Sequence, residues 1–280
     1  MSKTKIAYQG IAGANSHLIC TSFYPEMEAI NYPAFEDIFD AVTTDKAQYG
    51  VLPIENTYAG RVAEIHNLLH DTDLHMVAEH FHPIEHHLVA IKDTEISDIT
   101  EVYSHPQALM QCRKNLAKFK FTKQPFSNTA AAAQYVAQAG ANNKAALCTE
   151  LAAEIYGLQM VKKNIEDIKD NKTIFVVISK NAATLDPNKG KVMTTLLITV
   201  RNIPAAVYKM LSGFATNNIN LIKLESYIPG GYSTEAQFFL SFEGHARDRN
   251  VQAALEEVGF YSKNVKLLGV YYMDKERYNK

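Results

Sequence analysis

The sequence predicts an α/β unit followed by a smaller α+β unit, and three features of the pattern support this division. Over the first 180 residues, short apolar runs alternate with amphipathic helical stretches, which favours parallel strands joined by crossover helices. Residues 181–191 then form a break that is rich in Asn, Pro, Gly and Lys and has little to bury. After the break the predicted order is β-α-β-β-α-β, the ferredoxin-like split βαβ pattern. We therefore expect domains at 1–180 and 192–280.

Each element of the first unit has its own signal in the sequence. Ile6, Ala7 and Tyr8 make an apolar run that predicts a strand at 5–9, and a glycine turn follows it. The alanine-rich segment 129–139 predicts a helix capped by Asn128 or Thr129 and stopped at Gly140. The other expected strands are 49–53, two between 75 and 91 broken near Pro83, 102–104, 145–148 and 173–179. The other expected helices run from 15 or 16 to 24, over 35–43 and 61–69, from Ser104 through Cys112 to Phe119, and over 149–156.

The second unit repeats a strand-and-helix rhythm over some eighty residues. Strands are predicted at 192–200, 220–228, 235–242 and 265–272, and helices at 204–215 and 247–258. Pro204 lies early in the first turn of its helix, where a missing N–H costs nothing. This order predicts a small antiparallel sheet with two helices.

Composition excludes several classes of protein. The chain has 280 residues, with 28 Lys+Arg against 30 Asp+Glu, a net charge of 28 − 30 = −2, so it lacks the excess positive charge that nucleic-acid binding needs. Its apolar runs are far shorter than the ~18–20 residues of a membrane span. Cys20, Cys112 and Cys148 are odd in number and far apart, which suits a reducing cytoplasm better than disulfides or a zinc site. We expect a cytoplasmic protein without nucleic-acid or membrane partners.

Polar residues follow several predicted strands, where ligands bind in open α/β sheets. Gly10 and Gly13 lie between a strand and a helix, a place that attracts anions, although a plain turn is the commoner explanation. Glu55, Asn56 and Thr57 follow a buried strand and are either ligand contacts or helix caps. Ser104, with Gln111 further along the next helix, follows another strand, and capping is again the alternative.

Histidines gather between residues 75 and 87, but a metal site is the weaker interpretation. His80 and His82 share one face of a strand, yet no carboxylate or cysteine is placed to complete their coordination. His86 and His87 point to opposite faces if the chain there is extended. We expect neither a metal nor a cofactor.

The ordered set of motifs resembles the prephenate dehydratase family, in its monofunctional form with a C-terminal ACT regulatory domain. The resemblance covers essentially the whole chain. It is carried by segments that match in order and spacing: 9–16, 53–57 with 60–62, 104–109 with 111–112, 128–130, Ala152-Ala153 with 156–158, and Asn164-Ile165-Glu166-Asp167 with Asn171, Thr173 and Phe175. A single motif of this kind would be weak, but the ordered set is specific.

The resemblance implies a bilobed, periplasmic-binding-protein-like catalytic domain, with a second lobe at about 80–165, and conversion of prephenate to phenylpyruvate, water and CO₂ without a cofactor. It assigns catalysis to Thr173. The implied substrate-binding residues are Glu55, Asn56, Thr57, Ser104, Gln111, Thr129 and Phe175. Phenylalanine is the implied effector, bound by Ile203, Pro204, Ala205, Ala206, Glu225 and Ser226 in a homodimer or homotetramer.

The sequence departs from the family pattern in two places. Ile174 stands where the family usually has arginine, and isoleucine cannot make the bidentate carboxylate contact that arginine makes. The second unit reads Arg201-Asn202-Ile203-Pro204-Ala205-Ala206 and Glu225-Ser226-Tyr227, where the usual motifs carry Gly-Ala-Leu and Glu-Ser-Arg. Two alternatives stay open: an arogenate dehydratase, whose substrate has an amine in place of the keto group, and a catalytically weakened amino-acid sensor, which Ile174 motivates.

Overall fold

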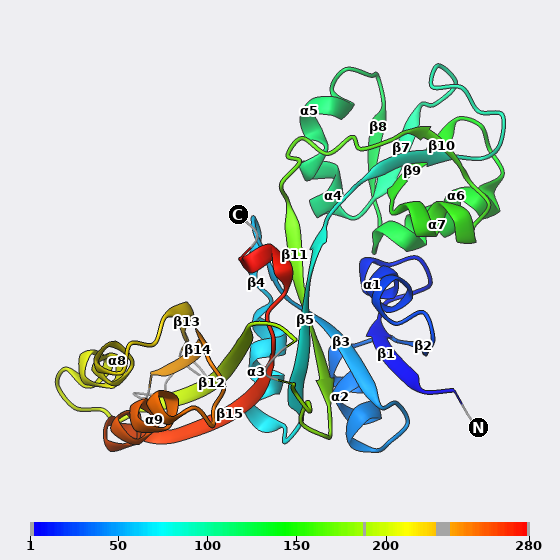
Figure 1. Ribbon diagram of the computed structural model, residues 1–280. Coiled ribbons are helices and arrows are strands. Elements are labelled where there is room, and N and C mark those ends of the chain that lie inside the picture. Colours follow the sequence, from blue (N-terminus) through cyan, green and yellow to red (C-terminus); the bar gives the residue numbers. More distant parts are fainter. Residues whose placement is uncertain (1–2, 187–188, 228–235, 279–280) are drawn as a thin grey trace. The chain divides into compact units, whose positions relative to one another are not determined.

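The computed structural model describes residues 3–186, 189–227 and 236–278, which fall into two compact units (Figure 1). Unit 1 consists of Met1–Ile38, Val51–Arg61 and Phe81–Phe175, and unit 2 of Phe39–Gly50, Val62–His80 and Val176–Lys280. Four elements run from one unit into the other: α2 (Phe35–Thr43), β3 (Tyr49–Asn56), β5 (His75–Pro83) and β11 (Lys172–Ser179). Each unit is therefore assembled from separate stretches of chain.

Unit 1 holds strands of both sheets that the described residues form. In the first sheet, β1 (Lys5–Gln9) pairs in parallel with β2 (Glu28–Tyr32), and α1 (Asn15–Phe23) connects them. The second sheet has the order β10-β6-β9-β7-β8. Its strands are β6 (His87–Ala90), β7 (Glu101–Ser104), β8 (Thr122–Pro125), β9 (Lys144–Cys148) and β10 (Gln159–Lys162).

The second sheet is mixed, so the expectation of parallel pairing was right for only part of it. β7 runs parallel to β8 and β9, and helices connect these strands: α4 (Pro106–Gln111) and α5 (Arg113–Leu116) before β8, and α6 (Thr129–Ala139) before β9. β6 is antiparallel to both β9 and β10. No helix lies between β6 and β7, and without a crossover helix the parallel arrangement is not required.

Helices cover both faces of this sheet. Leu88, Ala145 and Leu147 face one cluster that includes Leu109 and Leu116 of α4 and α5. Their neighbours Val89, Ala146 and Cys148 point the other way, into a cluster with the alanines of α6 and of α7 (Glu150–Ile155). Alternation along the strands thus explains why β6 and β9 are buried on both sides.

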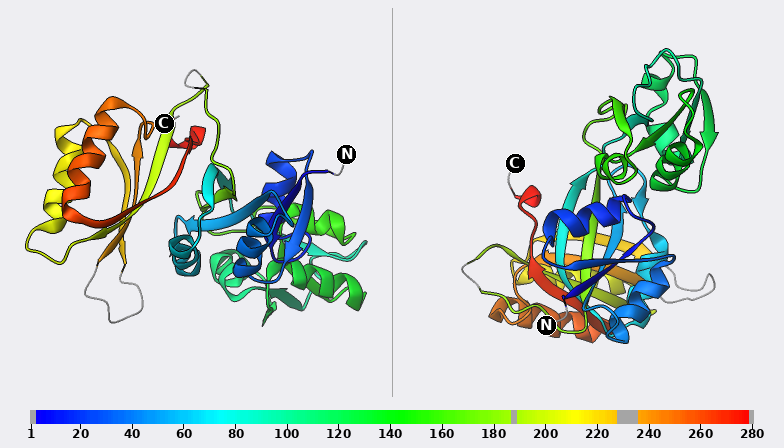
Figure 2. Two further views of the ribbon diagram at one scale, coloured as in Figure 1. Left: turned by 90° about the horizontal axis from the view of Figure 1, so that it is seen from below. Right: turned by 90° about the vertical axis from the view of Figure 1, so that its right-hand side faces the viewer.

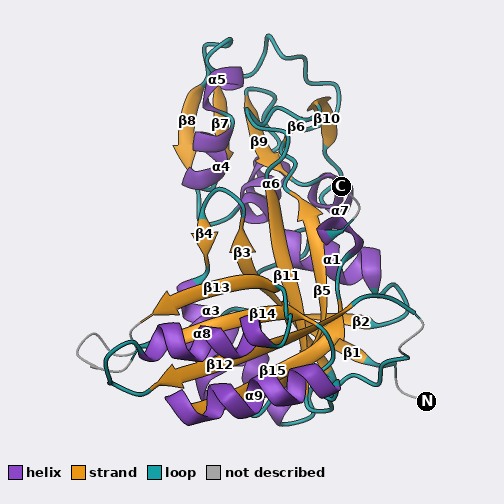
Figure 3. Cartoon of the chain, turned by 60° about the vertical axis from the view of Figure 1, so that its left-hand side comes forward, coloured by secondary structure: helices purple, strands orange, loops and turns teal. Residues whose placement is uncertain are grey.

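Unit 2 contains the predicted β-α-β-β-α-β order. Its strands are β12 (Val192–Val200), β13 (Leu221–Tyr227), β14 (Gln237–Glu243) and β15 (Ser262–Tyr272), arranged β13-β14-β12-β15 with antiparallel pairing. Helices α8 (Ala206–Thr216) and α9 (Arg249–Tyr261) lie side by side on one face of this sheet (Figures 2 and 3). Ile228 and Glu235, which the sequence placed in strands, lie outside the described residues.

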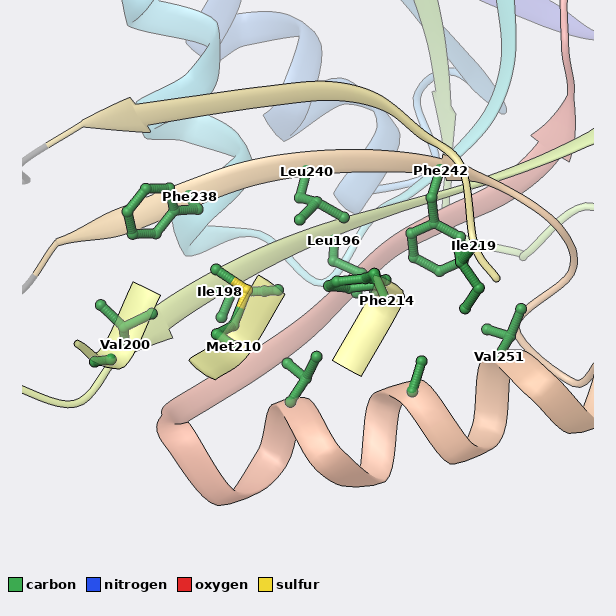
Figure 4. Packing of buried hydrophobic residues seen from close by; sticks show 13 residues of the cluster. Leu196, Ile198, Val200, Met210, Phe214, Ile219, Phe238, Leu240, Phe242 and Val251 are labelled. Atoms are coloured by element: carbon green, nitrogen blue, oxygen red, sulfur yellow. The ribbon is translucent and has the colours of Figure 1, made fainter. Parts of the chain in front are cut away.

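The core of this part of unit 2 lies between sheet and helices. Leu196 and Ile198 from β12 and Leu240 and Phe242 from β14 meet Met210 and Phe214 from α8 (Figure 4). Val251, Ala254 and Val258 close the cluster from α9. Phe214 and Phe242 are tilted rings whose centroids are 5.3 Å apart.

Two contacts join β15 to elements from the first half of the sequence within unit 2. Gly269 pairs with Met76 of β5 at a distance where an added Cβ would lie 2.1 Å from the Met76 carbonyl oxygen, so only glycine fits there. Lys266 reaches the carboxyl end of α3 (Ala63–Asp71), where its Nζ donates to the carbonyl oxygens of Leu69 at 3.2 Å and His70 at 2.7 Å, and also to that of Thr72. A cation at this end satisfies the carbonyls that a helix leaves unpaired. No helix in the described parts of the chain is long and apolar enough to cross a membrane.

Candidate active site

Asn56 lies at the turn between β3 and β4 (Gly60–Arg61) and organises it with both ends of its side chain. Its Oδ1 accepts hydrogen bonds from the backbone N–H groups of Tyr58 at 3.0 Å and Ala59 at 2.9 Å. Its Nδ2 donates to Asn171 Oδ1 at 2.8 Å and to Thr173 Oγ1 at 3.0 Å, with the Lys172 carbonyl 3.2 Å away. One amide therefore fixes the hairpin and ties it to the start of β11.

Thr57 makes a second connection between the hairpin and β11. Its backbone N–H donates to the Lys172 carbonyl at 2.9 Å, and its Oγ1 accepts from the Lys172 N–H at 3.0 Å. The hydroxyl also donates to Asn171 Oδ1 at 3.4 Å. Four side chains from two distant segments (Asn56, Thr57, Asn171 and Thr173) thus form one hydrogen-bonded cluster in unit 1.

Thr173 is buried, and its hydroxyl is hydrogen-bonded to Asn56. Its side chain is 8% exposed, and its Oγ1 accepts the hydrogen bond from Asn56, which directs the hydroxyl proton toward another acceptor. Because side chains alternate along a strand, Phe175 shares its face, and Ile174 points to the opposite one. Ile174 is only 7% exposed, so the residue that replaces the family's arginine is a buried apolar side chain on the other face of β11.

Glu55 sits at the end of β3 opposite Arg61 of β4, in antiparallel register. Phe175 is buried and meets His82 edge to face, with centroids 6.4 Å apart. Both residues belong to the two strands that carry the Asn56 cluster, so the structure brings these sequence-predicted residues to neighbouring positions along β3 and β11.

Gln111 belongs to a different network in unit 1. Its Oε1 lies 2.8 Å from His86 Nε2, and the backbone N–H of His86 donates to Glu166 Oε2 at 3.0 Å. Burial lowers the pKa of His86 below its usual 6.5, against smaller opposing effects from Gln111 and Glu166. Within the described residues, the hydrogen bonds of Gln111 go to His86 and Asp167 and not to the Asn56 cluster.

Ser104 and Thr129 are placed by backbone roles. Ser104 is fully buried, and its hydroxyl donates to the Leu147 carbonyl at 2.8 Å, which holds β7 against β9. His105, not Ser104, caps α4, because its ring accepts from the Gln107 N–H. Asn128 caps α6 by accepting from the Ala131 N–H at 2.7 Å, which leaves Thr129 as the first helical residue.

The backbone N–H and carbonyl groups of the glycine turn after β1 are hydrogen-bonded to other groups of the protein. The N–H groups of Gly10 and Gly13 donate to Tyr32 O and His17 Nδ1. The Gly13 carbonyl accepts from Thr149 Oγ1 at 2.6 Å. Gly13 has φ +88°, and an added Cβ would lie 2.6 Å from Ala152 Cα. The turn packs against the start of α7. Because the N–H groups of Gly10 and Gly13 already have acceptors within the protein, the geometry supports a structural turn rather than an anion-binding site.

The predicted effector residues lie in unit 2. Ala205 precedes α8 at the N-cap position and lies in the left-handed region, at φ +61°, and Ile203 is 45% exposed. Glu225 on β13 has its Oε2 3.1 Å from Lys223 Nζ and 3.9 Å from Nε2 of His66 on α3. Ser226 follows on the same strand.

Several buried cysteine and histidine side chains are uncharged near neutral pH. Burial raises the pKa of the Cys20 and Cys148 thiols to about 12, so both stay protonated near neutrality. Burial lowers the pKa values of His17, His82 and His87, and that of His80 to about 4, so these rings stay neutral. Within the described residues no group of three or more His, Cys, Asp or Glu is arranged to hold a metal ion.

Sequence reasoning did not single out Asn171 and His86 as site residues. Asn171 is 4% exposed and shares its Oδ1 between Asn56 and Thr57, a role that its position two residues before Thr173 could have signalled. His86 looked like one of several edge histidines, and nothing in its spacing indicates the bond to Gln111.

The sequence was compared with protein-family models and with known proteins, and both comparisons found matches. The family model described as prephenate dehydratase matches residues 6–183. A "Bifunctional N-acyl-homoserine lactone acylase/prephenate dehydratase" of Komagataeibacter europaeus is 37% identical over 266 residues, covering 95% of both chains. "Arogenate dehydratase/prephenate dehydratase 2, chloroplastic" of Arabidopsis thaliana is 33% identical, covering 98% of this chain and 74% of its own.

A solved structure also matches the whole chain. The prephenate dehydratase of Arthrobacter aurescens, in complex with L-Phe, superposes with a TM-score of 0.87 at 27% identity, covering 98% of this chain and 91% of its own. The match extends through unit 2 as well as unit 1. Since the family model covers more than half of the sequence and both relatives align over at least 95% of this chain, it belongs to the prephenate dehydratase family.

Proposed function

We propose that the chain converts prephenate to phenylpyruvate, water and CO₂. The observation that carries the proposal is the cluster of Asn56, Asn171 and Thr173, which presents a hydroxyl proton inside the matched domain. The reaction breaks the C–O bond of the ring hydroxyl and the C–C bond to the ring carboxylate. The electron pair of the C–C bond enters the ring, the hydroxyl leaves with a proton as water, and an aromatic ring results.

The chemistry asks for orientation and one well-placed proton donor. Aromatisation supplies much of the driving force, so neutral donors that hold the dianion in place are sufficient. Thr173 is the residue we assign to the departing hydroxyl, with Asn56 holding its oxygen. A positioned donor of this kind contributes about 10²–10⁴-fold to the rate.

We assign substrate binding to the residues around these two networks. Glu55 and Phe175 belong to the strands that carry Asn56 and Thr173, and Thr57 directly follows β3. Gln111 and Thr129 come from α4 and α6. Ser104 has its hydroxyl engaged by Leu147, which supports a role for it through the position of β7.

We further propose that 1–180 is a bilobed, periplasmic-binding-protein-like catalytic domain and 192–280 an ACT domain that binds phenylalanine. The antiparallel order β13-β14-β12-β15 with two helices on one face supports the second assignment. The Arthrobacter aurescens relative was solved with L-Phe. Residues 203–206, Glu225 and Ser226 are the proposed contacts, in a homodimer or homotetramer.

Calorimetric titration with phenylalanine, alongside light scattering, tests this regulatory half separately from the chemistry. We expect binding heat below millimolar ligand and a mass of at least a dimer. No heat at millimolar phenylalanine would refute the effector site, and a monomer would refute the assembly.

Two other activities have specific support among the relatives. The Arabidopsis thaliana relative is named for arogenate as well as prephenate. The Komagataeibacter europaeus relative, which aligns over 95% of this chain, is named as an N-acyl-homoserine lactone acylase besides. Purified protein should therefore be supplied in parallel with prephenate, arogenate and an N-acyl-homoserine lactone.

Replacement of Thr173 tests the main proposal. Thr173→Val keeps the shape of the side chain but removes the hydroxyl, so turnover of prephenate should fall about 100-fold or more. Thr173→Ser keeps the hydroxyl and should retain most of the activity. A folded Thr173→Val protein with wild-type turnover would remove Thr173 from the mechanism, and wild-type protein that leaves prephenate unchanged would overturn the function in favour of a sensor or of another substrate.

A further inference from the structure

His86 is a buried histidine that the proposed reaction does not use. It lies between β5 and β6, and it is 4% exposed. Its Nε2 is 2.8 Å from Oε1 of Gln111, at the end of α4. A polar ring enclosed this completely needs its hydrogen bonds defined, because an unpaired polar group in such a place is costly.

The chemistry of the two groups sets the direction of this hydrogen bond. An amide oxygen only accepts, so His86 Nε2 carries the proton and donates it. Burial lowers the pKa of His86 below 6.5, so the ring is neutral and Nε2–H is its one N–H group. Because Oε1 is turned toward His86, the two N–H groups of the Gln111 amide face away from it.

A single loop holds both partners in place. Residues 165–167 form this loop. The backbone N–H of His86 donates to Glu166 Oε2 at 3.0 Å, and the backbone N–H of Ile165 donates to the His86 carbonyl oxygen at 2.9 Å. The Asp167 N–H donates to the Gln111 carbonyl at 2.7 Å.

The same loop also anchors the helix that follows Gln111. The Asp167 carboxylate caps α5 by accepting from the N–H groups of Lys114 and Asn115. These bonds fix the backbone at His86 and at Gln111, from which the ring and the amide extend, and the hydrogen bond between Nε2 and Oε1 fixes the two side chains against each other.

We propose that His86 is a positioning residue that fixes the amide of Gln111 with its N–H groups outward, as a donor pair for a carboxylate of the substrate. The inference rests on the proposed function of Gln111. An amide free to rotate presents its oxygen to the anion part of the time, and that orientation repels a carboxylate. His86 removes this orientation, so its contribution lies in binding rather than in the chemical step.

Two variants separate positioning from packing. His86→Phe keeps a ring but has no donor, whereas His86→Gln places an N–H close to the position of Nε2. We expect His86→Phe to raise the KM for prephenate about 10-fold, the loss of one hydrogen bond to a charged group, with kcat changed less than about threefold. His86→Gln should restore the KM. An equal rise in both variants, or no rise in a folded His86→Phe protein, would overturn the inference.

Coupling between the two residues gives a second criterion. Gln111→Ala should raise the KM in the wild-type background and have little further effect in the His86→Phe background, because the two changes remove the same interaction. Additive effects would show that His86 acts independently of Gln111. Failure of the wild-type enzyme to convert prephenate would refute the proposed function instead.

The tautomer of His86 is a readout that needs neither variant nor activity. In protein labelled with ¹⁵N, the ring should show a protonated Nε2 and an unprotonated Nδ1 at pH 7. A proton on Nδ1 would overturn the inference even if the His86→Phe protein fails to fold.

Discussion

Gly13→Ala is expected to weaken the protein far more than an ordinary glycine replacement in a turn. Gly13 has φ +88°, and the new Cβ would lie 2.6 Å from both Cα and Cβ of Ala152. Positive φ costs an alanine about 1–2 kcal/mol, and forcing a methyl group against a backbone atom costs about 1–3 kcal/mol more. We expect the free energy of unfolding to fall by about 2–5 kcal/mol.

Gly140→Ala is the matched control for this replacement. Gly140 ends α6 at φ +60°, and nothing lies within 4 Å of an added Cβ there, so only the backbone cost of about 1–2 kcal/mol applies. Urea unfolding followed by circular dichroism gives both values, because the midpoint shifts while the slope stays constant. Equal losses in the two variants would refute the argument that the turn is docked tightly on α7.

Three further predictions concern stability. Ile174→Arg places a charge where the side chain is 7% exposed, so it should lower the free energy of unfolding by about 2 kcal/mol or more; a lower KM for prephenate with unchanged urea stability would show instead that this position meets the substrate. Ala205→Gly should raise the free energy of unfolding by about 1 kcal/mol, because Ala205 has φ +61° and glycine adopts that conformation without strain; a destabilised variant would contradict this. Burial lowers the pKa of His80 from 6.5 to about 4, so between these pH values the unfolded chain binds a proton that the folded protein does not. The free energy of unfolding should therefore fall by up to about 3 kcal/mol as the pH drops from 6.5 toward 4. His80→Gln should flatten this pH dependence in urea titrations, and an unchanged slope would assign the dependence to other groups.

The pattern of apolar residues correctly predicted elements that bury apolar side chains. β1, α2, α6 and β12 begin and end where the sequence placed them. The strands β2, β4, β8 and β10 were missed, and every residue of these strands is exposed or half-buried. Such strands are held by backbone pairing with a neighbour, a contact that local sequence does not reveal.

Other errors came from the limits of local rules. The helix predicted from Ser104 to Phe119 is two short helices that meet at Cys112, because the loop at 165–167 binds backbone groups of both. β3 continues to Asn56 although Pro53 lies within it, since its last residues pair with β4. In both cases a partner distant in sequence overrides the local signal.

The candidate site divides in the same way. The motifs identified Asn56 and Thr173 as candidate site residues, and in the structure Nδ2 of Asn56 lies 3.0 Å from Oγ1 of Thr173. What the motifs did not provide is which groups hold the reactive ones. Asn171 and His86 act through a shared oxygen and a ring proton, and such roles depend on orientation that a linear pattern does not record.

The attachment of Lys266 to the end of α3 sets an order of events during protein synthesis. The donor and its Thr72 acceptor are 194 residues apart, so at about 5–20 residues per second the ribosome needs about 10–40 s to produce the second after the first. Throughout that interval the carbonyl groups at the end of α3 and the β5 backbone beside Met76 lack the partners that β15 brings. Until β15 has been synthesised and has paired with β5, the nascent chain therefore carries an unpaired stretch of strand edge, which is a binding site for chaperones and a hazard for pairing with other chains.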